Sequence, residues 1–318
     1  MRAFLLHAGH SSLSVVPDPA PSQNEALLQI RLAGICNTDL EILKGYKGFS
    51  GILGHEFVAT VESCAVDPSI EGKRVVGEIN VSCHHCDMCL RGIPSQCRYR
   101  SAVGITGHDG AFADRMTLVR ENLHVVPDTI DDEHAVFVEP LAAALSICNL
   151  AHIRPSDRVL LIGAGKLGLL CAQVLRLTGA DVRVIARRSR PLELLKRWGI
   201  PVVAAEEIAA ASFDVVVDCT GNAQGFEAAL TYVRPRGTIV LKSTYEGTPA
   251  ADLSRIAVSE IRVVGSRCGP FDAALRVLEN RLVDVTSMIE ASYPLSDMTH
   301  AIAHAGQPGV LKVLVRPD

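Results

Sequence analysis

A strand that runs through a glycine-rich turn into a helix constrains the fold of this chain more than any other feature. Residues 158–162 read RVLLI and continue into GAGKLG, which opens a helix over about 166–178. Glycines in such a turn let the backbone bend tightly and approach a pyrophosphate at the helix N-terminus. The strand, turn and helix together predict a dinucleotide-binding site. Its candidate residues are Gly163, Gly165, Lys166, Leu167 and Gly168.

Strands and helices alternate through the middle of the chain. Apolar runs at 182–186, 214–218, 238–241 and 261–265 are separated by helical patterns near 191–198 and 224–233. This alternation predicts a parallel sheet built of βαβ units, and hence an α/β fold class. The segment before about Pro127 differs, because glycines and prolines interrupt it often. Apolar residues alternate there over 26–32, which predicts a half-buried strand.

The end of the second strand bears on the choice of cofactor. A carboxylate at this point would bind the 2′-hydroxyl of an adenosine ribose. The sequence is VIARRSR, with Ala186 in place of the acid and Arg187 and Arg188 after it. Two guanidinium groups suit a 2′-phosphate, and no carboxylate repels it. We therefore expect NADP as the cofactor, with NAD as the alternative and a solvated basic turn as the non-functional interpretation.

Four of the ten cysteines lie within sixteen residues, in SCHHCDMCLRGIPSQC. Cys83, Cys86, Cys89 and Cys97 have the spacing C-x2-C-x2-C-x7-C, and four thiolates at such intervals can close a tetrahedron around zinc. A bacterial ferredoxin would place its fourth cysteine after three residues and follow it with proline. We expect a structural zinc ion that organises a lobe and leaves no position for substrate. Five further cysteines lie in apolar or regular segments, and we expect them to be packing residues: Cys64, Cys148, Cys171, Cys219 and Cys268.

Length, charge and hydropathy narrow the class of protein. A chain of 318 residues suggests two domains, and a net charge of −4 without a basic run makes nucleic acid an unexpected partner. The N-terminal apolar run is too short for a signal peptide, and no segment has the ~20 apolar residues of a membrane span. We expect a cytoplasmic protein whose clustered thiols stay reduced and hold metal.

A second, open metal site is suggested by dispersed residues. GICNTDLE carries Cys36, LGHEF carries His55 and Glu56, and FVEPLAAAL carries Glu139. A cysteine, a histidine and a carboxylate from separate segments would leave the fourth zinc position to water or substrate. Spacing alone supports this only weakly, because a chain of this size contains unrelated cysteines and histidines.

These motifs, with DGAFAD at 109–114 and GAGKLG, occur in the order seen in the zinc-dependent medium-chain dehydrogenase/reductase family, the alcohol dehydrogenase superfamily, which nearly the whole chain resembles. The resemblance implies a GroES-like, mainly β catalytic domain over 1–139 and 270–318. It also implies a Rossmann cofactor domain over 140–269, and a homodimer or homotetramer.

The resemblance also assigns roles by position. Cys36, His55 and Glu139 match the ligands of a catalytic zinc, and Glu56 matches a residue that can approach that ion. Asp39 matches a residue that orients the zinc-bound histidine. Thr38 matches the hydroxyl that contacts the substrate oxygen and passes on its proton.

The sequence departs from the family pattern in three places. Many relatives carry a histidine three residues after the threonine, where this chain has Glu41, so that the proton relay uses Glu41, water or nothing from this segment. The stretch from Cys36 to His55 is a few residues shorter than usual. Lys242 stands where relatives often have a small residue, either contacting substrate or cofactor phosphate or exposed at a strand end.

The expected protein is an oxidoreductase with two zinc ions per chain. It would transfer a hydride between NADP(H) and a secondary alcohol, polyol or sugar. The alternatives are an NAD(H) enzyme for simple alcohols and aldehydes, a zinc-free reductase of the same superfamily, and a non-catalytic cofactor-binding protein.

Overall fold

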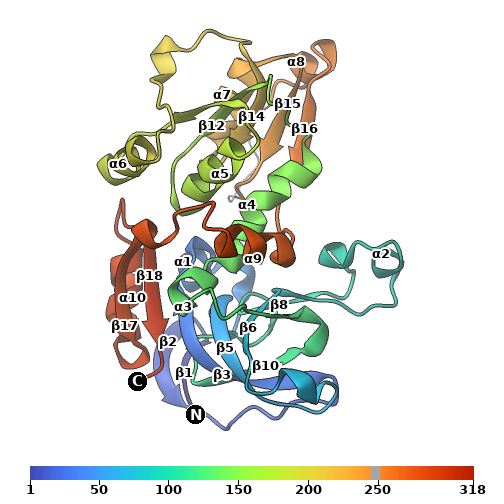
Figure 1. Ribbon diagram of the computed structural model, residues 1–318, viewed down its shortest axis with the longest axis vertical. Helices are drawn as coiled ribbons and strands as arrows, with labels where there is room; N and C mark the ends of the chain where they lie inside the picture. The colour runs from blue at the N-terminus through green and yellow to red at the C-terminus, as the bar shows by residue number, and fades with distance from the viewer. Residues whose placement is uncertain (245–250) are drawn as a thin grey trace. The chain divides into compact units, whose positions relative to one another are not determined.

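The chain forms two compact units in a computed structural model that describes residues 1–244 and 251–318. The split unit comprises Met1–Glu139 and Phe271–Asp318, and the central unit comprises Pro140–Pro270. Figure 1 follows the chain through both units from its N-terminus to its C-terminus. Within the described residues, the helices are all too short or too polar to cross a membrane.

The central unit is a parallel sheet with the strand order β13-β12-β14-β15-β16. Its strands are β12 (Arg158–Ile162), β13 (Asp181–Ile185), β14 (Phe213–Asp218), β15 (Val233–Leu241) and β16 (Arg262–Gly265). Its helices are α5 (Lys166–Arg176), α6 (Ser189–Arg197), α7 (Ala223–Tyr232) and α8 (Leu253–Val258).

The central strands are apolar on both faces, as parallel strands covered by helices must be. In β12 the four residues Val159–Ile162 are all buried. The chain crosses from β12 to β13 on one side and then returns past β12 to β14 on the other. Such a reversal opens a crevice at the carboxyl ends of the strands, which is where ligands bind in sheets of this type.

The split unit is mainly β. A seven-stranded sheet has the order β11-β6-β5-β3-β18-β17, with β10 also paired to β3, and two three-stranded sheets have the orders β2-β1-β4 and β7-β8-β9. The large sheet contains β3 (Glu25–Gly34), β5 (Glu56–Cys64), β6 (Arg74–Gly77), β10 (Arg115–Val119), β11 (Leu123–Val125), β17 (Ile289–Pro294) and β18 (Lys312–Arg316). The smaller sheets contain β1 (Arg2–His7), β2 (His10–Val15), β4 (Gly51–Ile52), β7 (Asn80–Val81), β8 (Ser101–Val103) and β9 (Gly107–His108).

The helices of the split unit are short. They are α1 (Asn37–Leu43), α2 (Asp87–Leu90), α3 (Asp132–Ala135), α9 (Phe271–Glu279) and α10 (Met298–Ala305). Helix α4 (Val138–Leu150) begins in this unit and continues into the central one. Cys148 near its end is exposed, so the prediction that this cysteine packs in a core is wrong. Cys64 and Cys171 are buried, as expected.

Strand β3 shows how the sequence pattern produces this sheet. Leu28, Ile30 and Leu32 are buried, whereas Gln29 and Arg31 between them are exposed, which confirms the predicted half-buried strand. Because side chains alternate along a strand, one face of β3 packs into the core and the other meets solvent. The strand pairs with β5, β10 and β18, and it therefore holds together segments from both ends of the chain.

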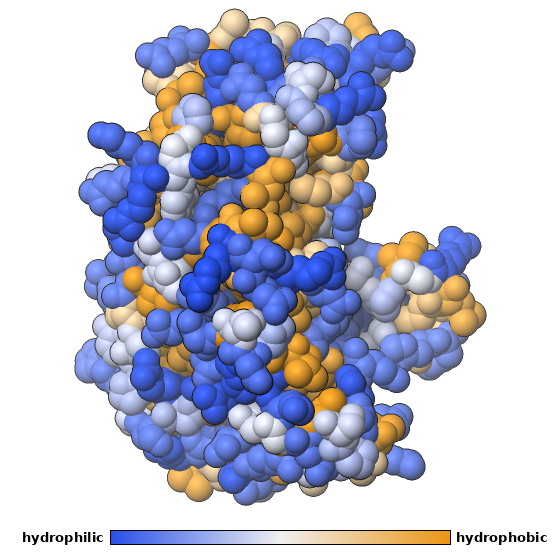
Figure 2. All heavy atoms as spheres, viewed as in Figure 1, coloured by the Kyte–Doolittle hydropathy of each residue, from blue (hydrophilic) through white to orange (hydrophobic). Residues whose placement is uncertain are grey.

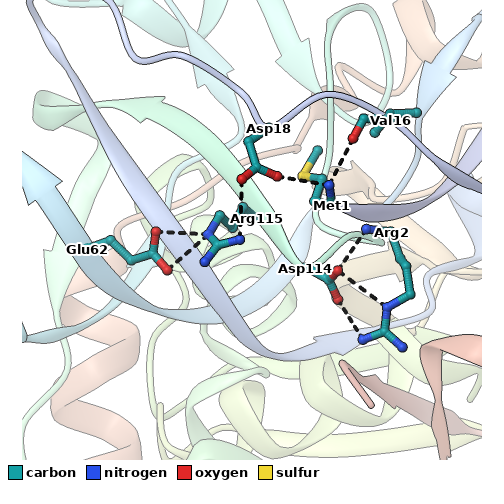
Figure 3. Close-up of polar contacts among 7 residues, drawn as sticks. All are labelled: Met1, Arg2, Val16, Asp18, Glu62, Asp114 and Arg115. Carbon is teal, nitrogen blue, oxygen red and sulfur yellow. Dashed lines mark hydrogen bonds and ion pairs between the residues drawn. The ribbon is translucent and has the colours of Figure 1, made fainter.

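Charged groups fasten the N-terminus to this sheet (Figure 3). The ammonium of Met1 lies 2.8 Å from the Asp18 carboxylate, and the side chain of Met1 is almost fully buried. Arg115 at the start of β10 pairs with Asp18 at 3.6 Å and donates to Glu62 of β5 at 2.9 Å. The network therefore joins the first residue to two strands of the large sheet.

His124 fastens helix α9, where the chain returns to the split unit. Its Nε2 lies 2.9 Å from Glu78, its Nδ1 lies 2.9 Å from Asp272 in the first turn of α9, and its ring stacks on Phe271 at 5.2 Å. Burial favours the neutral imidazole, but the hydrogen bonds to Glu78 and Asp272 outweigh burial and raise the pKa of His124. A protonated His124 therefore bridges two carboxylates.

We predict that this bridge weakens as the pH rises. Because the pKa is higher in the folded chain, its contribution is complete below the unfolded value of ~6.5 and is lost as the pH rises through the folded value. His124→Gln should lower the free energy of unfolding by about 1 kcal/mol or less at about pH 6, since both carboxylates are partly exposed, and by nothing measurable at about pH 9. Urea unfolding of both proteins across this range measures the difference, and a constant gap would contradict the prediction.

Candidate active site and metal centres

Three metal-binding side chains meet in the core of the split unit. Cys36 precedes helix α1, His55 lies just before β5, and Glu56 is the first residue of β5. One ligand atom from each lies within 4.8 Å of the others, and His55 and Glu56 are only 3% and 1% exposed. A thiol, an imidazole and a carboxylate so close together form a donor set that suits zinc. Residues nineteen positions apart in the sequence are thus brought to one point.

Asp39 contacts both Cys36 and His55 of this cluster. Its Oδ2 accepts a hydrogen bond from the backbone N–H of Cys36 at 2.8 Å, and its Oδ1 lies 3.2 Å from Nδ1 of His55. The second contact is close enough for an ion pair but is not aligned as a hydrogen bond, so both atoms are buried without a hydrogen-bond partner. Burial favours neutral His55, yet the charges of Asp39 and Cys36 raise its pKa well above the ordinary value. The cluster thus attracts positive charge, and its residues fit a bound zinc ion.

Lys312, which sequence reasoning missed, supplies a positive charge beside the cluster. It is the first residue of β18, is 2% exposed, and forms a buried ion pair with Glu56. Its Nζ lies 5.5 Å from the centre of the Phe137 ring. Burial lowers the pKa of Lys312, but the charges of Glu56, Cys36 and Glu139 outweigh burial and raise it. Nothing in the local sequence KVLVR marks this lysine as different from one at an ordinary strand end.

Glu139 stands apart from the group of three. It is the second residue of α4 and is half-buried, and its ligand atoms are not among those within 4.8 Å of Cys36 and His55. Its charge does act on Lys312, which also interacts with Cys36 and Glu56. Glu139 therefore belongs to the same charged environment, and its role as third zinc ligand stays a prediction.

The two candidates for proton transfer lie in different surroundings. The Cys36 thiol donates to Oγ1 of Thr38 at 3.7 Å, which places this hydroxyl beside the cluster. Glu41 is exposed and accepts a hydrogen bond from Lys44 at 2.8 Å. The structure therefore brings Thr38 to the metal-binding group and leaves Glu41 at the surface.

The four-cysteine cluster is assembled around helix α2. Its sulfur atoms are separated by 3.5 Å between Cys86 and Cys89, 3.8 Å between Cys86 and Cys97, and 4.0 Å between Cys83 and Cys89. A tetrahedron with Zn–S bonds of about 2.3 Å places sulfurs roughly 3.8 Å apart, whereas a disulfide would require about 2.05 Å. The four thiols therefore fit one zinc ion.

Backbone groups prepare two of these thiols, Cys86 and Cys97, for metal. Hydrogen bonds from the backbone N–H groups of Arg98 and Cys89 lower the pKa of Cys86 to about 6. Backbone N–H groups of Cys83 and Tyr99 donate to the Cys97 sulfur, each at 3.3 Å. Such donors stabilise thiolates, which are the form that binds zinc.

The lobe also exposes apolar Leu90 and Ile93, and Figure 2 shows apolar residues gathered on it.

The glycine-rich turn joins the carboxyl end of β12 to the start of α5. Gly163 has φ +98°, and a side chain there would meet the backbone of Cys219 at 2.9 Å, just after β14. A Cβ on Gly168 would lie 2.1 Å from the carbonyl oxygen of Gly163. Gly165, by contrast, has open space around it and precedes the first turn of α5, whose first residues are Lys166 and Leu167. The turn is thus tightly packed at Gly163 and Gly168 and has open space at Gly165, as a pyrophosphate-binding turn requires.

Three other candidate cofactor residues lie in the central unit. Arg187 and Arg188 are both exposed between β13 and α6, and Arg188 immediately precedes that helix. Lys242 is 6% exposed and donates to the Ser266 hydroxyl at 3.1 Å and to the carbonyl of Arg267 at 2.7 Å. The interpretation of Lys242 as an exposed lysine at a strand end is therefore wrong.

Two family models and a solved structure match this chain. The family model described as "Alcohol dehydrogenase GroES-like domain" matches residues 22–128, and the one described as "Zinc-binding dehydrogenase" matches residues 167–281. A zinc-binding dehydrogenase from Sinorhizobium meliloti 1021, solved bound to NADP, is 30% identical, with a TM-score of 0.92 and 99% of each chain covered. The chain belongs to the zinc-dependent medium-chain dehydrogenase/reductase family. The predicted fold class, with its Rossmann and GroES-like domains, is thereby confirmed.

Two curated relatives are named for sugar alcohols. D-arabinitol dehydrogenase 1 of Uromyces fabae is 29% identical over 94% of this chain and 92% of its own length. Sorbitol dehydrogenase of Halalkalibacterium halodurans is 26% identical over 97% of this chain and 96% of its own length. Membership of this family makes the chain an oxidoreductase that acts on alcohols and uses zinc and a nicotinamide cofactor.

We predict that the four-cysteine lobe depends on its metal. Cys97→Ser should remove one zinc ion per chain, because a hydroxyl is a poor substitute for a thiolate. The lobe around residues 82–98 should then become sensitive to proteases, since structural zinc contributes directly to local folding. Native mass spectrometry counts the metal, and limited proteolysis tests the lobe. Cys148→Ser, which changes an exposed cysteine, is the matched control, and full zinc content in the Cys97 variant would contradict the prediction.

Proposed function

We propose that this protein is a zinc-dependent polyol or sugar dehydrogenase that uses NADP(H). The cluster of Cys36, His55 and Glu56 carries the proposal, because it combines zinc-binding donors with a buried, charged environment. The names of the relatives from Uromyces fabae and Halalkalibacterium halodurans support a sugar alcohol as substrate. The alternative within this class is an enzyme for simple alcohols and NAD(H).

The proposed zinc content is two ions per chain. Cys36, His55 and Glu139 would hold the catalytic ion, with Glu56 close enough to approach it. Cys83, Cys86, Cys89 and Cys97 would hold the structural ion. Zinc at the first site supplies a Lewis acid that polarises the substrate oxygen. The second site has four thiolates and therefore no position for substrate.

The residues of the chain would divide the remaining work. Asp39 holds the backbone of Cys36 and faces the His55 ring, which fixes the orientation of two ligands. Thr38 lies beside the Cys36 sulfur and would accept the proton of the substrate hydroxyl. Glu41 is directed to Lys44, so that the proton would pass from Thr38 to water rather than through Glu41. A nicotinamide cofactor held at the glycine-rich turn would supply the hydride acceptor.

NADP is the cofactor that the central unit favours. Arg187 and Arg188 follow β13 and are exposed to solvent, where they are free to meet a 2′-phosphate, and Ala186 adds no opposing charge. The Sinorhizobium meliloti relative was solved with NADP. A relative from Escherichia coli CFT073, 25% identical, was solved with NADH, so similar proteins have been solved with each of the two cofactors.

We also propose a homo-oligomer in the cytoplasm. Strand β16 forms an edge of the central sheet, and Val263 on it is 38% exposed. Leu253 and Val258 of the neighbouring helix α8 are 71% and 85% exposed. An apolar edge strand of this kind favours pairing with a second copy of the chain.

The proposed reaction predicts a specific loss on removing the ligands. Cys36→Ala and His55→Ala should each abolish turnover of polyols, because the metal that polarises the substrate is lost. Both variants should still bind NADPH, since the glycine-rich turn belongs to the other unit. Initial rates over a panel of polyols, sugars and simple alcohols, with NADPH binding by fluorescence, test this. Wild-type turnover in either metal-free variant would contradict the mechanism, and binding of cofactor without turnover of any alcohol by the wild type would favour a non-catalytic protein.

Cofactor preference gives an independent prediction. Ala186→Asp should shift the preference toward NAD, because a carboxylate would repel the 2′-phosphate and bind a ribose 2′-hydroxyl. Loss of charge-assisted hydrogen bonds worth roughly 1.5–3 kcal/mol corresponds to a ten- to hundredfold change. The ratio of kcat/KM for NADP and NAD measures it, with Ala186→Asn as the uncharged control. An unchanged ratio would show that this turn does not select the cofactor.

A further inference from the structure

Lys242 ties together the ends of two neighbouring strands of the central sheet. It follows β15 directly and is only 6% exposed. Its Nζ donates to the Ser266 hydroxyl at 3.1 Å and to the carbonyl oxygen of Arg267 at 2.7 Å, and both acceptors follow β16. A buried ammonium needs such partners, because an unsatisfied charge is strongly unfavourable away from water. The side chain therefore bridges the two strand ends instead of extending into solvent.

The segment of residues 266–269, which follows β16, is fixed at both of its ends. At its start, the N–H of Ser266 donates to the carbonyl oxygen of Leu241 in β15 at 2.9 Å, beside the lysine bridge. At its end, a Cβ on Gly269 would lie 1.8 Å from the carbonyl oxygen of Ala142 in α4. The segment is thus held by the bridge on one side and packed closely on a helix on the other.

The bridged strand ends lie on the ligand-binding edge of the sheet. All five strands are parallel, so their carboxyl ends share the edge at which the glycine-rich turn follows β12. A dinucleotide lies across the carboxyl ends on both sides of such a turn. Arg187 and Arg188 follow β13 on one side and would meet the adenosine half. The nicotinamide half would then extend over β14, β15 and β16, where Lys242 lies.

Lys242 is also within electrostatic reach of the glycine-rich turn. Cys219 follows β14, and its backbone lies where a side chain on Gly163 would have to go. A hydrogen bond with Cys171 and burial raise the pKa of the Cys219 thiol well above its ordinary value, whereas the ammonium of Lys242 acts in the opposite direction. The bridge and the turn therefore belong to one continuous part of the sheet edge.

We propose that Lys242 is a positioning residue that fixes residues 266–269 and thereby shapes the place where the nicotinamide ring of the cofactor binds. The inference rests on the proposed dehydrogenase function and deepens it. A ring that transfers hydride has to be held beside the reacting carbon in one orientation, because small displacements greatly reduce the rate. Lys242 acts through the segment and does not itself touch the cofactor or the substrate.

The test compares the whole cofactor with a fragment that lacks the nicotinamide. Calorimetry gives the Kd of NADPH and of 2′-phospho-ADP-ribose for the wild type and for Lys242→Met. NADPH should bind about tenfold more weakly to the variant, because hydrogen bonds from a charged donor no longer hold the segment. The fragment should bind equally well to both proteins. At saturating NADPH and substrate kcat should also fall, since the ring is no longer held in one orientation. If the wild type prefers NADH, the matching pair is NADH and ADP-ribose.

Two further variants separate this role from general support of the fold. Ser266→Ala removes one of the two contacts and should give a smaller loss of affinity, again for NADPH and not for the fragment. Lys196→Met changes an exposed lysine in the last turn of α6 and should leave both Kd values and kcat unchanged. An equal loss for NADPH and for the fragment in Lys242→Met would overturn the inference, because it would indicate contact with a cofactor phosphate or support of the whole unit. Unchanged affinity for both ligands would overturn it as well.

The proposed function can fail separately. If the wild type binds neither NADPH nor NADH, or turns over no alcohol with cofactor bound, the function is wrong whatever the Lys242 variants show. If the wild type binds cofactor and is active, and Lys242→Met keeps the wild-type ratio of the two Kd values, only the positioning role is wrong.

Discussion

The burial of opposite charges in a β-sheet core is the constraint on which the site depends. Asp39, His55, Glu56 and Lys312 are each between 0% and 3% exposed, where an unpaired charge is very costly. Each is therefore tied to a partner, Glu56 to Lys312 and His55 to Asp39. A cluster that needs compensating positive charge, and whose partners come from helix α1 and from strands β5 and β18 with the residue before β5, is both rigid and selective for cations. The sheet supplies the rigidity, because β3 is paired on both sides.

Much of the fold could be predicted because its signals are local. The parallel strands read as short apolar runs, and the turn after β12 combines a strand, glycines and a helix within about twenty residues. Helix α4 was harder to recognise, since it is apolar around most of its circumference and has no polar face to reveal a helical period. The order of strands in the split sheet depends on pairing between distant segments, which periodicity does not encode.

The four-cysteine cluster could be named from its spacing, whereas Cys36, His55 and Glu56 could be named only with the help of the family resemblance, because isolated cysteines and histidines carry little signal. Lys312 could not, because its role arises from contact with a residue 256 positions away. A lysine at the start of a strand carries no mark of its burial until β3 places it beside Glu56. For the same reason, Glu41 resembled a relay residue in the sequence, but the structure directs its carboxylate to Lys44 at the surface.

Anomalous diffraction at the zinc edge from crystals of the purified protein tests the central claim most directly. The account predicts two peaks per chain, one among the four cysteines of the lobe and one within bonding distance of the Cys36 sulfur and the His55 ring. A fully occupied lobe with no anomalous peak at Cys36 and His55, in crystals of enzyme that oxidises alcohols, would contradict it.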